Sequence, residues 1–101
     1  MKLMSLTKDT DGKHKYIAIF DINGKPKKTH FGQAGANDYL IYSKQSKTIA
    51  DERKKAYLAR HEKRETWSDP TTAGSLSRYL LWGSSSSLKQ NIIDFKNRFN
   101  L

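Results

Sequence analysis

Residues 14–31 read HKYIAIFDINGKPKKTHF, and they give the strongest indication of the fold. Its first nine residues, His14 to Ile22, are rich in β-branched and aromatic side chains, as is typical of a strand. Asn23-Gly24 follows, and both residues tolerate the positive φ of a two-residue hairpin turn. Lys25 to Phe31 then returns as the partner strand, with Pro26 favouring an edge position. The stretch therefore predicts an antiparallel β-hairpin.

A third strand is expected before the hairpin. Leu3 to Thr7 fits a short strand, and Asp-Thr-Asp-Gly at residues 9–12 predicts the connecting turn, because its glycine supplies positive φ. Within the central strand Ile17 and Ile19 occupy one face, and the other face carries Tyr16, Ala18, Phe20 and Ile22. Apolar side chains on both faces would let this strand be covered on both sides.

Helices are expected in the second half of the chain. The first runs from Ile49 to about Trp67, with a capping arrangement at Thr48 and Asp51, and Asp69-Pro70 ends it. The second runs from Ala73 to Trp82 and is apolar nearly all round, which predicts a central, buried position. Thr71 or Thr72 can cap this second helix.

The last helix follows a run of four serines at 84–87, the final one of which can cap it. Its apolar stripe recurs at helical spacing and consists of Leu88, Ile92, Phe95 and Phe99. The apolar island at 38–42 is either one helical turn or an anchored loop. Together these features predict a single α+β domain, with a β-hairpin or three-stranded meander over 1–32, a loop over 33–47 and three α-helices over 48–101.

Composition limits the class of protein. The chain has 101 residues and no cysteine, which excludes disulfides and thiolate chemistry. The first eight residues are too short and polar for the core of a signal peptide, so we do not expect secretion. No apolar run approaches the roughly eighteen residues that a membrane span requires.

Positive charge is the strongest global signal. Nineteen Lys and Arg against ten Asp and Glu give a net charge of +9, which attracts nucleic acid or another acidic partner. The charge concentrates on the hairpin and on the first helix, where Arg53, Arg60 and Arg64 fall on a connected side. The alternative is a solvated surface balanced by its own carboxylates. The candidate phosphate-binding residues are Lys13, Lys15, Lys25, Lys27, Lys28, Arg53, Arg60, Lys63 and Arg64.

Catalytic and metal chemistry find little support in the sequence. The three histidines have no familiar ligand spacing on one element, and although His14 and His30 could meet across the hairpin, surface strand histidines are the simpler interpretation. We therefore expect no catalytic residues, no metal and no cofactor, and a binding protein in place of an enzyme. A polar network that joins the first two helices is also a candidate, and it would consist of His61, Glu65, Asp69 and Arg78.

An ordered set of residues carries a family resemblance. It comprises Phe31-Gly32, Gly35, Asp38-Tyr39, the segment YLARH at 57–61, Glu65-x-Trp67, DPTTAG at 69–74 and SRYLLW at 77–82. In this order they resemble a family of small basic proteins of unknown function encoded by large double-stranded DNA viruses of algae, amoebae and other protists. The match runs from about residue 15 to the C-terminus. It departs from the family pattern in the loop at 36–47 and in the serine run at 84–87.

The resemblance implies a viral protein located in the virion or in the viral factory of the host cytoplasm or nucleus. It implies no particular activity and transfers no catalytic residue. Combined with the charge, it favours a protein that binds DNA or RNA non-specifically through phosphate contacts. The alternative is a minor capsid or internal virion protein that acts through contacts with other virion proteins.

Overall fold

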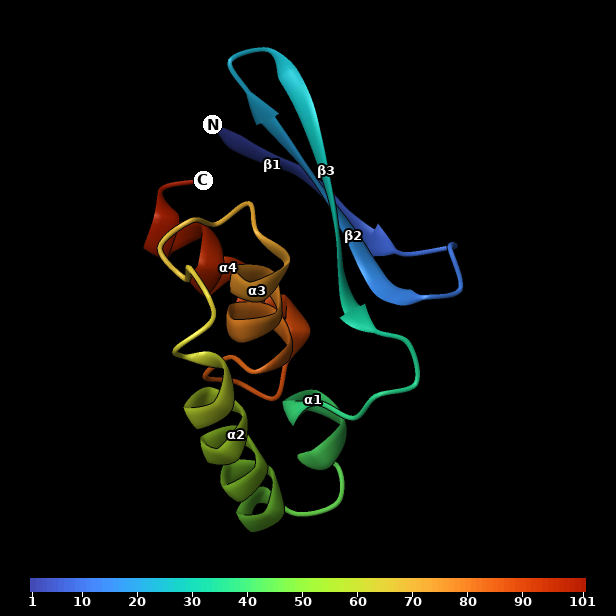
Figure 1. Ribbon diagram of the computed structural model, residues 1–101, viewed down its shortest axis with the longest axis vertical. Coiled ribbons are helices and arrows are strands. Elements are labelled where there is room, and N and C mark those ends of the chain that lie inside the picture. The colour runs from blue at the N-terminus through green and yellow to red at the C-terminus, as the bar shows by residue number, and fades with distance from the viewer.

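The computed structural model describes residues 1–101 and begins with a three-stranded antiparallel sheet. Its strands are β1 (Lys2–Lys8), β2 (His14–Ile22) and β3 (Lys25–Gln33), paired in the order β1-β2-β3 (Figure 1). The expected α+β fold is confirmed, and its β part is the full meander with β2 in the middle.

The turn between β2 and β3 has the geometry that its sequence predicts. Asn23 has a φ of 53° and Gly24 a φ of 81°, and Ile22 pairs with Lys25 across the turn. Positive φ at both central residues is what a type I′ turn requires, and it suits the right-handed twist of the strands. We call this turn, with the lysines that follow it on β3, the tip of the sheet.

Four α-helices follow, where three were expected. The apolar island forms the short α1 (Tyr39–Tyr42), with Asp38 as its N-cap. The long helix α2 spans Lys47–His61 and is capped by Ser46, so the expected cap at Thr48 and the expected end near Trp67 are wrong.

The segment after α2 is closed by local backbone bonds and held to the next helix. Beyond His61 the chain closes with backbone bonds from the Arg64 and Glu65 N–H groups to the His61 carbonyl. The hydroxyl of Ser75 then donates to the Thr66 carbonyl at 3.1 Å, which ties this segment to the next helix. Helix-forming residues alone could not reveal that contact, because propensity is readily overridden by tertiary context.

The buried second helix is confirmed in position but is not uniform. It consists of α3 (Ala73–Leu76), capped by Thr72, and a π-helical turn η1 (Ser77–Leu81) that continues it. Leu76 and Leu80 are fully buried, and both pack in one cluster with the core residues of the sheet. The last helix, α4 (Leu88–Phe99), is capped by Ser87 as expected.

The helices cover one face of the sheet only. Ala18 and Phe20 of β2 and Phe31 of β3 belong to the same core cluster as the helical leucines. Ile17 and Ile19 point to the other face, are half-buried and do not join that cluster. The expectation of a strand covered on both sides is therefore wrong, because no helix is left to cover the outer face.

Candidate nucleic-acid interface

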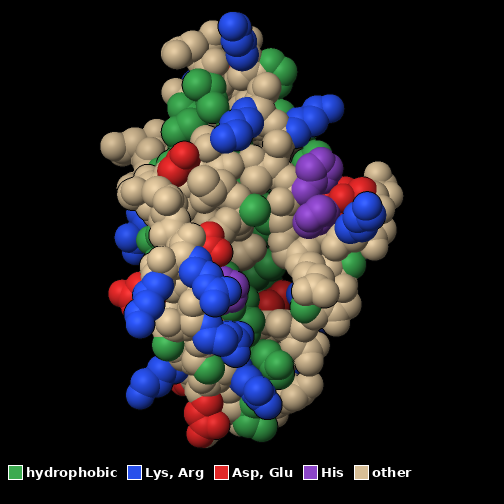
Figure 2. All heavy atoms as spheres, in the orientation of Figure 1, with side chains coloured by type: hydrophobic (Ala, Val, Ile, Leu, Met, Phe, Trp, Pro, Cys, Tyr) green, Lys and Arg blue, Asp and Glu red, His purple; other side chains and the backbone are tan.

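Most of the positive charge of this protein is not neutralised within the fold. Of the nineteen Lys and Arg side chains, two form ion pairs with carboxylates: Lys15 with Asp38, and Lys47 with Asp51. Figure 2 shows Lys and Arg side chains gathered over α2 and again toward the tip of the sheet, with a few acidic groups between them. The exposed members of this set can therefore meet an external anion, whereas Lys54 and Arg78 are half-buried and donate to backbone carbonyls.

The tip carries Lys25, Lys27 and Lys28, all exposed on β3. The ammonium of Lys27 donates to the Thr71 hydroxyl at 2.9 Å. Thr71 in turn donates both its N–H and its hydroxyl to Asp69. These two bonds, of which the backbone bond contributes more, hold the pKa of Asp69 below its usual value. Lys25 and Lys28 make no hydrogen bond within the protein. Lys13 is also exposed, but it lies in the turn at the opposite end of β2.

The second cationic group lies on and just beyond α2. Arg53 and Arg60 are exposed on the helix, whereas Lys63 and Arg64 lie in the turn that follows it. The expected single row of Arg53, Arg60 and Arg64 along one helix is therefore wrong, because the helix ends at His61. The guanidinium of Arg53 lies 5.6 Å from the Tyr42 ring centroid, which restrains this side chain at the surface. We call Arg53, Arg60, Lys63 and Arg64 the α2 group.

Lys15 does not belong with these exposed cations. Its ammonium lies 2.6 Å from Asp38, and the two side chains are only 15% and 5% exposed. Asp38 also caps α1 by accepting the Ile41 N–H. The ion pair therefore joins β2 to α1 inside the protein, and Lys15 has a structural role in place of the expected phosphate contact.

A hollow of about 370 Å³ opens between α2, the end of β3 and the helix that follows Thr72. Arg60 and His61 line one side, and Lys15 and Asp38 line the other; Figure 2 shows the depression beside a histidine, with acidic and basic groups inside it. The hollow thus lies on the face that carries the α2 group.

An aromatic stack forms one wall of this hollow. The Tyr57 ring lies 4.5 Å from the Trp82 ring and 4.3 Å from the His61 ring, measured between centroids, and both pairs are stacked. Burial, with a smaller contribution from the Glu65 carboxylate, raises the pKa of Tyr57 to about 12. The raised pKa reflects a phenol that lies largely out of water, within the aromatic stack.

The expected polar network of His61, Glu65, Asp69 and Arg78 is divided into separate contacts. His61 lies 3.3 Å from Glu65, and Asp69 contacts Thr71. Arg78 instead donates to the Trp82 carbonyl at 2.9 Å and lies 5.5 Å from the Trp67 ring centroid. Burial lowers the pKa of Arg78, which fits a structural guanidinium packed between aromatic rings.

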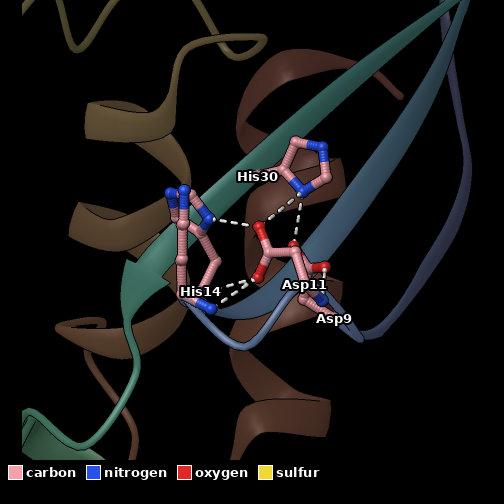
Figure 3. Close-up of polar contacts among 5 residues, drawn as sticks. Asp9, Asp11, His14 and His30 are labelled. Carbon is pink, nitrogen blue, oxygen red and sulfur yellow. Dashed lines mark hydrogen bonds and ion pairs between the residues drawn. The ribbon is translucent and has the colours of Figure 1, made fainter.

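A further polar cluster lies at the turn between β1 and β2, where His14 and His30 meet across the hairpin, although the sequence favoured separate surface histidines. It brings together Asp9, Asp11, His14 and His30, and the ring centroids of the two histidines are 5.5 Å apart (Figure 3). The hydrogen bond from His14 holds the pKa of Asp11 well below its usual range. The signal in the sequence was the spacing Asp-x-Asp-x-x-His, which begins in the turn and ends on β2, together with His30 on β3.

Comparison with family models, with curated proteins and with solved structures gives no match to this chain. The resemblance to viral proteins therefore stays a prediction from the residues that carry it. None of the helices has both the length and the apolar character needed to cross a membrane.

Proposed function

We propose that this protein binds nucleic acid without sequence preference, through phosphate contacts made by the tip lysines and the α2 group. The observation that carries the proposal is the near absence of carboxylate partners for the cations, since only Lys15 and Lys47 are paired with one. Exposed, unpaired cations release bound counterions from a polyanion when they contact it, and this release drives non-specific binding.

The two cationic groups lie on separate parts of the molecule. The protein extends 43 Å along its longest axis, and Figure 1 places the tip of the sheet near one end of that axis and the start of α2 at the other. Arg60, Lys63 and Arg64 lie at or beyond the C-terminal end of α2, which is nearer the sheet, so the two groups are separated by less than the full length of the protein. They could therefore contact separate segments of one nucleic-acid backbone.

The chemistry of these side chains favours contact with phosphates over reading of bases. Lysine is a compact point charge on a flexible stem, and it has no geometric preference for a base edge. The α2 group mixes arginines on a helix with cations in the following turn, so no row of fixed donors is presented to a groove. Phosphate contacts fix position and supply affinity but carry no sequence information.

The biological setting is part of the same proposal. A small basic protein that coats or condenses nucleic acid would act in the virion or in the viral factory, as the family resemblance implies. The net charge of +9 supports binding along the whole length of a nucleic acid in preference to binding at one specific sequence.

Fluorescence anisotropy with labelled duplex DNA, single-stranded DNA and RNA tests this proposal. If about six phosphates are contacted, the logarithm of the association constant should fall against the logarithm of salt concentration with a slope of about −5 on duplex DNA. Two duplexes of different sequence should give the same affinity. Absence of binding at low salt, or a binding constant that salt does not change, would overturn the proposal.

A further inference from the structure

The cluster at the β1–β2 turn gathers four metal-ligating side chains from three segments of the sheet. Asp9 and Asp11 lie in the turn, His14 begins β2 and His30 belongs to β3. One candidate ligand atom from each residue lies within 4.8 Å of all the others. Figure 3 shows the two imidazoles directed at the Asp11 carboxylate from different sides, with Asp9 beside it.

The backbone of the turn fixes the two carboxylates and leaves one oxygen of each directed at a histidine. Asp9 Oδ1 accepts the Asp11 N–H, and Asp11 Oδ1 accepts the N–H groups of Lys13 and His14 at 2.8 and 2.9 Å. The second oxygens face the imidazoles: His30 Nδ1 is 2.5 Å from Asp9 Oδ2, and His14 Nδ1 is 2.7 Å from Asp11 Oδ2. The Asp9 side chain is only 4% exposed, although it lies in a surface turn.

We propose that Asp9, Asp11, His14 and His30 form a binding site for a divalent transition metal, with Zn²⁺ as the ion that the donor set suits best. Two imidazole nitrogens and two carboxylate oxygens supply the four ligands of a tetrahedral site. Imidazole nitrogen favours Zn²⁺ and related ions, whereas Ca²⁺ and Mg²⁺ select oxygen ligands.

The present spacing needs only side-chain adjustment to accept the ion. Bonds of about 2.0–2.2 Å in a tetrahedron place ligand atoms about 3.4 Å apart. His30 Nδ1 already lies 3.5 Å from Asp11 Oδ2. The two shorter contacts would have to open, and the widest pair would have to close by no more than about 1.4 Å. An imidazole nitrogen that binds the ion cannot carry a proton, so each neutral ring would hold its proton on Nε2 when Nδ1 is a ligand.

The site would act as a clamp on the end of the sheet. A bound ion would link the β1–β2 turn to β3, and the structure already joins these two segments through the contact between His30 and Asp9. An ion that binds only the folded protein stabilises it by mass action. This inference does not depend on nucleic-acid binding, because none of the tip lysines or the α2 group belongs to the cluster.

Calorimetric titration of Zn²⁺ into the full chain, after treatment with a chelator, tests the proposal directly. One ion should bind per chain, and the thermal unfolding midpoint should rise by several degrees. Co²⁺ should give the intense visible absorption of a tetrahedral complex. The double variant His14→Asn and His30→Asn should bind at least about a hundredfold more weakly, because residues that only orient a ligand already cost about 10–100-fold when they are lost.

His61→Asn is the matched control, because His61 also pairs with a carboxylate and is similarly exposed, but it lies outside the cluster. Circular dichroism of each metal-free variant shows whether the fold is kept. If the folded double variant binds Zn²⁺ as tightly as the unmodified chain, or if the unmodified chain takes up no Zn²⁺, the proposal is overturned. The cluster is then a set of hydrogen bonds that holds the turn.

Discussion

The two turns of the sheet lie at opposite ends of β2 and use charge in opposite ways. The β1–β2 turn holds two aspartates whose oxygens are occupied by backbone N–H groups and by histidines from β2 and β3. The tip has one aspartate, Asp21, which accepts the Gly24 N–H at 2.8 Å, and it carries lysines without carboxylate partners. The charged groups of the β1–β2 turn are paired within the fold, whereas the lysines of the tip have no carboxylate partner and can contact an outside anion.

The comparison indicates that different residues of this small domain control its stability and its binding. Side chains that hydrogen-bond to one another hold a long turn in place, and removing them should reduce the free energy of unfolding. Exposed cations without a carboxylate partner add little to stability, and removing them should weaken association with a polyanion. The same sheet therefore offers substitutions that affect one property and leave the other unchanged.

The largest expected effect follows from neutralising the tip. Replacing Lys25, Lys27 and Lys28 together with Gln should weaken duplex binding about a hundredfold at 0.1 M salt and reduce the salt slope by about three, roughly one for each lost phosphate contact. The free energy of unfolding should fall by no more than about 1 kcal/mol, because no lysine of the tip forms an ion pair and only the Lys27 side chain makes a hydrogen bond, to Thr71. Anisotropy at several salt concentrations, with urea unfolding in parallel, measures both.

A variant with the same net charge supplies the control for the tip. Replacing Lys44, Lys89 and Lys96 with Gln removes three exposed lysines from other elements. These lysines are not part of the proposed interface, so the loss of affinity should be much smaller than for the tip variant. Equal losses would mean that binding follows total charge and that neither turn has a special role.

The next largest effect should come from the other turn and should appear in stability. Replacing Asp9 with Ala removes the acceptor for the Asp11 N–H and for His30, and we expect the free energy of unfolding to fall by about 1–2 kcal/mol in the presence of a chelator. Replacing Asp21 with Ala removes a single bond at the tip and should cost less. Equal costs in chemical denaturation would contradict the contrast between the turns.

A smaller effect is expected from the backbone of the tip. Gly24 has a φ of 81°, a conformation that costs an L-residue roughly 1–2 kcal/mol. Gly24→Ala should therefore lower the free energy of unfolding by about 1 kcal/mol. Gly24→Asn should lower it less, because Asn tolerates left-handed backbone. Thermal unfolding of both variants checks the order, and an equal or reversed order would argue against the turn geometry.

Local patterns in the sequence were sufficient for the tip and for the boundaries of the last two helical segments, at 73–81 and 88–99. Alternating apolar residues around Phe20, the Asn23-Gly24 turn and the serine cap at Ser87 are each determined by near neighbours in the chain. The end of α2 at His61 was missed because residues 62–67 have helix-forming side chains, whereas in the fold this segment turns and bonds to Ser75 through Thr66. The sequence also did not show that the helices cover only one face of the sheet, because that arrangement depends on contacts between distant segments.

The sites were predicted less well because they depend on distances between segments. Lys15 looked like its exposed neighbours in the hairpin until it was placed beside Asp38, twenty-three residues away. The Asp9 cluster needed the position of the first turn relative to His30, and strand pairing alone sets His30 opposite Ile17, not His14. Net charge is visible in composition, but which charges cancel is a property of the folded chain.

The smallest expected effect concerns pH and the contact that links the tip to the helices. Hydrogen bonds from Thr71 lower the pKa of Asp69, and the nearby Lys27 ammonium contributes less. A depressed pKa adds stability above the ordinary value of about 3.9, and this contribution is lost as the pH falls through the lower folded value. Because Asp69 is exposed, solvent screening should keep the effect below about 1 kcal/mol.

Asp69→Asn tests this contribution, because Asn keeps an oxygen that can accept the Thr71 bonds but does not ionise in this range. The stability advantage of the unmodified chain over the variant should be present at about pH 5 and should shrink as the pH falls below about 4. Urea unfolding across that range measures it. Parallel pH profiles for the two proteins would show that Asp69 contributes nothing, and the link between Lys27 and the helices would then rest on the uncharged hydrogen bond to Thr71 alone.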